Sequence, residues 1–151
     1  MEKHTRTEKP EILLEEYRRL LEDENIEALP LVISGNSMSP FLVHGRDTVY
    51  LSRPSGPIKK GDVVLYRRDN GAYILHRVHK VEKDSFTMTG DAQTYLEKGI
   101  RPDQIIAVMT SALRKGKRQQ AGCFWWDFFE KIWPRMLYLR PVAVKIYTFI
   151  R

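Results

Sequence analysis

Residues 31–42 read LVISGNSMSPFL. A short apolar run leads into a turn that holds Ser37, and Pro40 prevents a regular strand from continuing through that turn. The arrangement presents the hydroxyl of Ser37. Because a serine hydroxyl is a weak nucleophile without a neighbouring base, its function depends on what the rest of the chain brings to it.

The segments around this turn predict a mainly β fold. Five later segments, rich in β-branched or aromatic residues and bounded by turn residues, are expected to be strands. They are residues 48–51, 62–66, 73–81, 86–89 and 105–109. Before the turn, apolar residues recur at helical spacing behind Pro10, which predicts an amphipathic helix over residues 10–22, preceded by a polar, frayed stretch over residues 1–9.

Length and composition are those of a single globular domain. Of the 151 residues 42% are hydrophobic, and Cys123 is the only cysteine, which excludes an intramolecular disulfide and a cysteine-based metal cluster. No stretch approaches the roughly 20 apolar residues of a membrane span, and the first thirty residues are too charged for a signal peptide. We expect no cofactor, no metal, and a cytoplasmic or peripheral membrane location.

The end of the chain differs from the rest in charge. Residues 111–151 carry nine Lys or Arg against two Asp or Glu, whereas residues 1–110 carry 16 against 17. Residues 114–120 are predicted to be a hydrophilic connector, and residues 123–150 are aromatic and basic. This tail is interpreted in two main ways: as amphipathic helices that complete the core, or as a peripheral contact of residues 122–151 with an anionic membrane. We expect no nucleic acid, because large apolar residues dilute the basic ones.

The strand expected over residues 73–81 supplies a base. Alternation along it puts His76 on the same face as its apolar neighbours Ile74 and Val78. An imidazole with an unperturbed pKa near 6.5 can accept a serine proton near neutral pH, and a carboxylate is needed to hold its tautomer. Asp91 and Glu97 follow closely in the sequence, and both are candidates for that role.

Four short motifs occur in order along the chain: GNSMSP at residues 35–40, KGDVV at 60–64, HRV at 76–78 and GD at 90–91. Together they resemble the motifs of the signal peptidase I family and its LexA-type relatives, over roughly residues 31–110. The resemblance implies a coiled β domain, a serine nucleophile at Ser37 and a general base at His76. With histidine as the base, the sequence is similar to the serine–histidine branch, which comprises the endoplasmic-reticulum type and its bacterial counterparts.

The sequence departs from that family at two places. Aligning the GD motif puts Glu97 where the serine–histidine branch has a catalytic aspartate, so the choice between Glu97 and Asp91 stays open. Members that process secretory preproteins usually carry a membrane span before the serine motif, where this chain has its acidic helix. LexA-type relatives carry a DNA-binding domain there, and thirty residues with one expected helix cannot hold a helix-turn-helix.

The predicted organisation has three regions. Residues 1–30 form a polar segment and helix, residues 31–113 the serine peptidase domain with its coiled β fold, and residues 114–151 a tail with amphipathic helices. In the predicted mechanism Ser37 attacks a peptide carbonyl, and His76 takes the serine proton and returns it to the leaving amine. The backbone N–H of Ser37 would meet the oxyanion, with Gly35 keeping the approach open. Further candidates for oxyanion or substrate contacts are Ser34, Asn36, Met38 and Ser39.

The predicted function is that of a serine endopeptidase, similar to signal peptidase, that cleaves peptides or protein precursors. An extended substrate would add to an edge strand near Ile33 or to the strand of His76. The preference for small residues before the cut is implied by the resemblance alone. Two alternatives stay open: a catalytically silent peptide-binding module of the same fold, and a LexA-type peptidase that cleaves its own chain.

Overall fold

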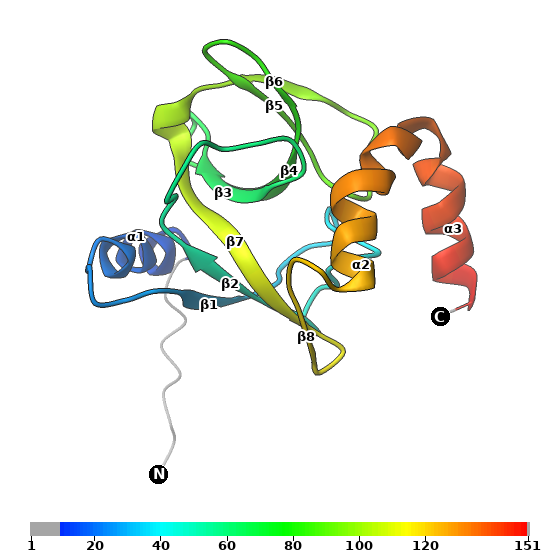
Figure 1. The fold of residues 1–151 in the computed structure, drawn as a ribbon, viewed down its shortest axis with the longest axis horizontal. Helices are drawn as coiled ribbons and strands as arrows, with labels where there is room; N and C mark the ends of the chain where they lie inside the picture. The colour runs from blue at the N-terminus through cyan, green and yellow to red at the C-terminus, as the bar shows by residue number, and fades with distance from the viewer. Residues whose placement is uncertain (1–9, 151) are drawn as a thin grey trace.

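The protein is represented by a computed structural model that describes residues 10–150 (Figure 1). Within this range the strands are β1 (Leu29–Val32), β2 (Thr48–Ser52), β3 (Val63–Arg67), β4 (Tyr73–Val81), β5 (Phe86–Thr89), β6 (Glu97–Ile100), β7 (Ile105–Arg114) and β8 (Lys117–Gln119). The helical elements are α1 (Pro10–Leu21), η1 (Pro102–Gln104), α2 (Phe124–Asp127), η2 (Phe128–Ile132), η3 (Trp133–Leu139) and α3 (Arg140–Ile150). The predicted mainly β class is confirmed. The stretch predicted to be frayed, residues 1–9, lies outside the described residues.

The strands form one antiparallel sheet in the order β1-β2-β7-β3-β4-β5-β6, with β8 paired to β7. The long strand β7 joins its two halves, since it pairs with β2 along one part and with β3 along the other. Register shifts interrupt four of the strand pairs, and such irregularities bend a sheet and increase its twist. Figure 1 shows the resulting coiled sheet.

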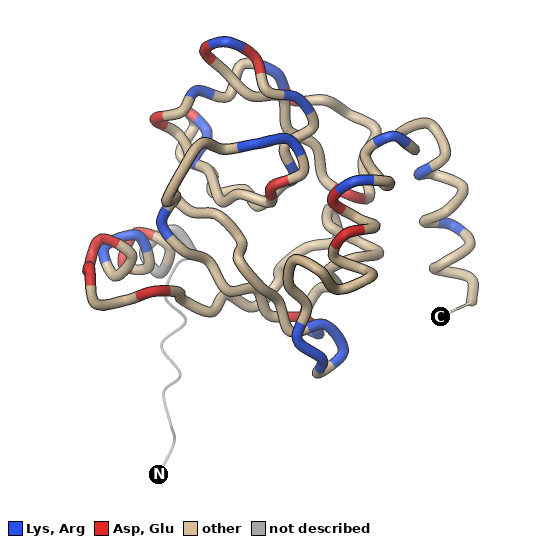
Figure 2. The backbone as a smooth tube through the Cα atoms, in the orientation of Figure 1, with Lys and Arg blue, Asp and Glu red and all other residues tan. Residues whose placement is uncertain are grey.

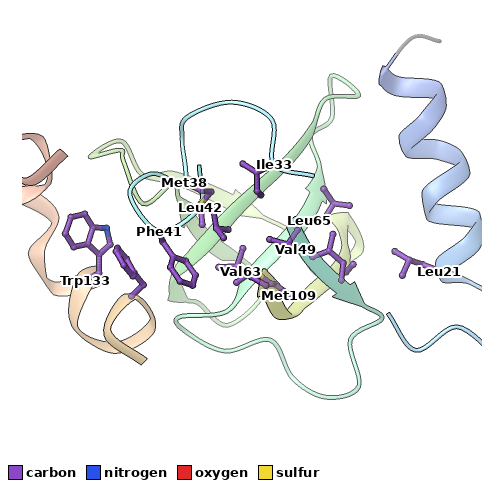
Figure 3. Packing of buried hydrophobic residues seen from close by; sticks show 14 residues of the cluster. Leu21, Ile33, Met38, Phe41, Leu42, Val49, Val63, Leu65, Met109 and Trp133 are labelled. Atoms are coloured by element: carbon purple, nitrogen blue, oxygen red, sulfur yellow. The ribbon is translucent and has the colours of Figure 1, made fainter. Parts of the chain in front are cut away.

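Alternate residues of the central strands belong to two separate apolar clusters. Val63 and Leu65 of β3 lie in the first core cluster, whereas Val64 and Tyr66 lie in the second, as the period of two along a strand requires. The first cluster also holds Leu21, Ile33, Met38, Phe41, Leu42, Val49, Leu51, Ala107, Met109, Ala112, Phe129 and Trp133. Figure 3 shows that this cluster extends from α1 to the C-terminal helices.

The predicted N-terminal helix is present as α1, and it packs against the sheet. Leu21, at the end of α1, is 2% exposed and belongs to the first core cluster. The Tyr17 hydroxyl donates a hydrogen bond to Leu29 O (2.7 Å), and the Tyr73 hydroxyl donates one to Glu15. These bonds fix α1 beside β1 and β4.

Residues 124–150, called the C-terminal segment below, are helical and pack against the sheet on one side. Phe129 and Trp133 are buried in the first core cluster, and the ring of Phe129 stacks on Phe41 with centroids 4.8 Å apart. Arg140 is completely buried. The prediction of amphipathic C-terminal helices is confirmed. None of the helices in the described range has the length and hydropathy required to cross a bilayer.

The connector predicted over residues 114–120 is wrong, because this stretch forms a hairpin in which β8 pairs with β7. Lys115 and Gly116 at its turn both have positive φ, of 52° and 76°. Two consecutive residues of this kind match the twist of a two-residue hairpin, for which Asn-Gly is the usual sequence signal. The sequence Lys-Gly carries only half of that signal. Strand β6 was also not predicted, since residues 97–100 are neither alternating nor β-branched along most of their length.

Candidate active site

Ser37 lies in a loop of residues 33–47 that connects β1 to β2 and is called the serine loop below. Two backbone bonds close its base: Ile33 N–H donates to Asp47 O (3.0 Å), and Gly45 N–H donates to Ile33 O (2.9 Å). The apolar residues of the loop that lie in the first core cluster are Ile33, Met38, Phe41 and Leu42. Ser37 is half-buried within this anchored loop.

Gly35 changes the direction of the chain before Ser37. Its φ of +86° lies in the left-handed region, which residues with a Cβ rarely adopt. Its N–H donates to His44 Nδ1 (2.8 Å). Ser34, Gly35 and Asn36 are exposed, whereas Met38 is 2% exposed. Of the predicted oxyanion and substrate contacts, three therefore face solvent, Ser39 is half-buried and Met38 is part of the core.

The backbone of Ser37 is held by the loop that follows β5. Ala92 N–H donates to Ser37 O (2.9 Å), and a Cβ at position 90 would collide with the same carbonyl oxygen. Glycine at position 90 is therefore required by this close approach. Among the described residues no acceptor takes the N–H of Ser37.

His76 lies on β4, opposite Val64 of β3, and is 5% exposed. Its neighbours Ile74 and Val78 pack in the second core cluster, which confirms the predicted face. The His76 Nδ1 atom is 3.4 Å from the Tyr66 hydroxyl. The strand pairing thus determines which side chains surround the imidazole.

A polar chain extends from His76 to Arg68. The Tyr66 hydroxyl donates a hydrogen bond to Glu97 Oε1, and Arg68 donates to both oxygens of Glu97, at 2.8 and 3.1 Å. Burial raises the pKa of Glu97, but the bonds from Arg68 and Tyr66 lower it, and the net shift is downward. Glu97 is therefore ionised at neutral pH. It is hydrogen-bonded to Tyr66, which in turn contacts the imidazole of His76.

The environment of His76 keeps the ring neutral. Burial lowers its pKa from 6.5 to about 4, the positive charge of Arg68 acts in the same direction, and the carboxylates of Glu97 and Asp91 oppose both. The pKa of His76 therefore lies below the reference value of an imidazole, and the sequence alone does not show how completely the ring is covered. At pH 7 the imidazole is unprotonated and can accept a proton.

Asp91 has a different partner. Arg77, the residue after His76, donates to both Asp91 oxygens at 2.8 and 2.9 Å, and the two side chains are 3% and 0% exposed. Arg77 also donates to Gly61 O (2.7 Å). No hydrogen bond joins Asp91 to His76 in the described range. Both carboxylates thus bond to groups on or beside β4, but only Glu97 is connected to His76, through Tyr66.

Ser37 and His76 line one cavity of about 200 Å³, between the serine loop and β4. Its other walls are mostly apolar and include Leu14 of α1, Ile33 and Leu75. Four larger depressions on the surface contain neither Ser37 nor His76. No hydrogen bond joins Ser37 to His76 in residues 10–150, and such bonds are often long before a substrate is bound.

A profile of the Peptidase S24-like family matches residues 7–112, well over half of the chain. The chain belongs to the Peptidase S24-like family. This membership places it in the superfamily of LexA and signal peptidase I and gives it a serine peptidase-like fold. The same comparisons found no matching curated protein and no matching solved structure. In the part of this S24-like protein that the structure describes, no three His, Cys, Asp or Glu side chains are grouped to hold a metal ion.

Residues beyond the S24-like match also support the site. Trp133 Nε1 donates to Asp91 O (2.8 Å), and the Arg140 guanidinium donates to Gly90 O (3.1 Å) and Gln93 O (3.0 Å). The C-terminal segment therefore clamps residues 90–93, which in turn hold the backbone of Ser37. The basic and aromatic composition of this segment gave no sign of these contacts.

Tyr66, the direct partner of His76, was not predicted from the sequence. Tyr66 lies two residues after Val64 on a strand that was correctly predicted, so its face could be inferred. Its contact with His76 depends on the pairing of β3 with β4, and the pairing is not readable from either strand alone. In this S24-like domain the polar partner of His76 comes from the neighbouring strand.

Proposed function

We propose that this S24-like protein is a serine endopeptidase with Ser37 as nucleophile and His76 as general base. The observation that carries the proposal is the shared cavity, to which the serine loop contributes Ser37 and β4 contributes His76. In the reaction Ser37 Oγ attacks the substrate carbonyl carbon while its proton passes to His76. His76 then gives that proton to the leaving amine, and water hydrolyses the acyl-enzyme.

Tyr66 supports this proposal because it selects the ring nitrogen that acts as the base. Its one hydroxyl proton is donated to ionised Glu97, so its oxygen can only accept from His76 Nδ1. Nδ1 then carries the imidazole proton, and Nε2 has the lone pair that would take the proton of Ser37. In this proposal Glu97 orients His76 through Tyr66, and Asp91 shapes the loop that holds Ser37.

The oxyanion would be stabilised by the N–H of Ser37, which has no acceptor among the described residues. Ser34 and Asn36 are exposed nearby in the chain and are candidates for the second donor. Preorganised donors of this kind account for a large part of the rate in acyl transfer.

The substrate would bind as an extended peptide beside β1. This strand is at one end of the sheet order and leads directly into the serine loop, and Val32 on it is 60% exposed. An edge strand can pair with a peptide backbone and leave the adjoining apolar cavity for one side chain. A peptide or precursor protein is therefore the proposed substrate. Histidine at the position of the base supports a signal-peptidase-like enzyme of the serine–histidine branch.

The test is the labelling rate of the purified protein with a serine-directed acylating probe between pH 3.5 and 9. We expect labelling to be half-maximal near pH 4 and level through neutral pH, because His76 must lose its proton to act. Ser37→Ala should abolish labelling and His76→Ala should lower it at least about a hundredfold. Ser55→Ala is the matched control, since Ser55 is exposed and lies outside the site.

If the native protein is labelled no faster than Ser37→Ala, the proposal is overturned. The protein would then be a peptide-binding module of the same fold. Intact mass measured after prolonged incubation tests the self-cleaving alternative. A native chain that keeps its full mass while it labels at Ser37 acts on other substrates. Loss of a fragment from the native chain but not from Ser37→Ala would instead identify its own chain as a substrate.

A further inference from the structure

Helix α3 carries an apolar stripe that faces solvent. Its members are Val142, Ile146, Phe149 and Ile150, which are 59, 56, 89 and 73% exposed. The spacing i, i+4, i+7, i+8 puts them on one face of the helix. A stripe with this spacing normally packs into a protein core, and here it does not.

The opposite side of α3 is fixed to the body of the protein. Arg46 donates to the Tyr147 hydroxyl (3.2 Å), and Ala143 packs against the first core cluster. Arg140 at the start of the helix is buried and bonded to the loop after β5. The helix therefore cannot turn its exposed stripe inward without breaking these contacts. In Figure 1 α3 lies at the outer side of the molecule, on the opposite side from α1.

The charged residues of the chain segment that contains the stripe have one sign. From residue 131 to residue 151 the chain has five Lys or Arg and no Asp or Glu. Lys131, Arg135 and Lys145 are exposed. Figure 2 shows only basic positions along this part of the chain, whereas α1 carries both signs. An exposed apolar face in a chain segment whose charged residues are all basic is complementary to a surface that is apolar inside and negative outside.

We infer that α3 docks on the surface of an anionic lipid bilayer. With 11 residues the helix is about 16 Å long, too short for a hydrocarbon core of roughly 30 Å, so it would lie in the plane of the interface. The stripe would enter the boundary of the acyl chains, and Lys131, Arg135 and Lys145 would contact the negative headgroups. This inference does not depend on peptidase activity, because lipid binding is measured without turnover.

The experiment is flotation of the full chain with phosphatidylcholine vesicles that contain or lack phosphatidylglycerol. We expect the protein to float with the anionic vesicles only and to be released by salt. Ile146→Ser/Phe149→Ser should weaken binding to anionic vesicles by at least about tenfold. Lys131→Gln/Arg135→Gln/Lys145→Gln should abolish the preference for phosphatidylglycerol.

The matched control is Leu20→Ser/Val81→Ser, which removes two exposed apolar side chains elsewhere and should leave flotation unchanged. Circular dichroism checks that every variant is folded, which is expected because all the substituted side chains are exposed. Equal binding by the native protein and Ile146→Ser/Phe149→Ser, or no binding to either vesicle, would overturn the inference. So would a native dimer in sedimentation that Ile146→Ser/Phe149→Ser dissociates, because the stripe would then be an interface between two copies.

Discussion

Two polar networks lie on opposite faces of β4 and connect this strand to different parts of the molecule. On one face His76 contacts Tyr66, whose hydroxyl is bonded to Glu97, and this network reaches the cavity that contains Ser37. On the other face Arg77 and Asp91 form a buried ion pair that ties β4 to the loop after β5. The consecutive residues His76 and Arg77 therefore have different contacts, because successive side chains along a strand point to opposite faces.

The second network continues into the C-terminal segment. Trp133 and Arg140 bond the backbone of residues 90–93, and Ala92 bonds the carbonyl of Ser37. In the proposed mechanism the first network supplies the base, and the second determines the position of the nucleophile. Substitutions in the second network should therefore alter stability and activity together, whereas substitutions in the first should alter activity with little loss of stability.

The largest effect is expected at Gly90, where the second network meets the serine loop. In Gly90→Ala the new methyl group collides with Ser37 O, so the loop or the nucleophile must move. We expect a loss of about 1–3 kcal/mol in the free energy of unfolding. Labelling by the acylating probe should fall on the order of a hundredfold, because displacement of a nucleophile by about 1 Å has effects of that size.

Gly56→Ala is the control for this substitution. Position 56 has no heavy atom within 4 Å of an added Cβ and no positive φ, so both stability and labelling should be unchanged. Native labelling by Gly90→Ala would mean that the loop after β5 does not determine the position of Ser37.

The second prediction concerns Arg140, the buried residue of the clamp. Arg140→Met leaves the carbonyls of Gly90 and Gln93 without their donor, which should cost about 2 kcal/mol of stability. Labelling of the folded protein should fall about twentyfold through a lower rate constant, with the half-saturating probe concentration unchanged. Arg140→Lys keeps a donor and should recover part of the rate.

Two further variants test whether this effect comes from the clamp. Arg135→Met removes an exposed arginine of the same segment and should leave both stability and labelling unchanged. Trp133→Phe keeps a buried ring but loses the bond to Asp91 O, so it should show a smaller loss of the same kind. A fall in labelling that only follows the unfolded fraction would make Arg140 a structural residue without a positioning role.

The sequence predicted much of the fold, because local patterns carry it. The alternation over residues 73–81 and the helical spacing over residues 10–22 match β4 and α1 closely. Ser37 and His76 could be selected from motifs, and the face of His76 followed from the strand period. β8 was not predicted because its hairpin turn lacks the usual Asn-Gly signal. Its strand conformation depends on pairing with β7.

The partners of the site residues could not be predicted in the same way. Tyr66 meets His76 only through the register between β3 and β4, and Arg77 meets Asp91 only through the path of the loop after β5. Asp91 and Glu97 are similar as sequence candidates, and tertiary structure gives them different partners. The low pKa of His76 also depends on burial, which no local pattern reports.

The smallest effect is expected at Tyr66, which belongs to the first network. Tyr66→Phe keeps the buried ring and removes only the hydroxyl between His76 and Glu97. The imidazole then loses the acceptor that fixes its tautomer, so the labelling rate constant should fall about fivefold, close to 1 kcal/mol and similar to one hydrogen bond. Stability should change less than in Arg140→Met. Saturation kinetics and thermal unfolding of the same preparation measure both quantities, with Tyr95→Phe as control because Tyr95 is 72% exposed. Tyr66→Phe could instead destabilise the protein as much as Arg140→Met and leave the rate constant unchanged. Both networks would then only stabilise the fold, and His76 would need another orienting group.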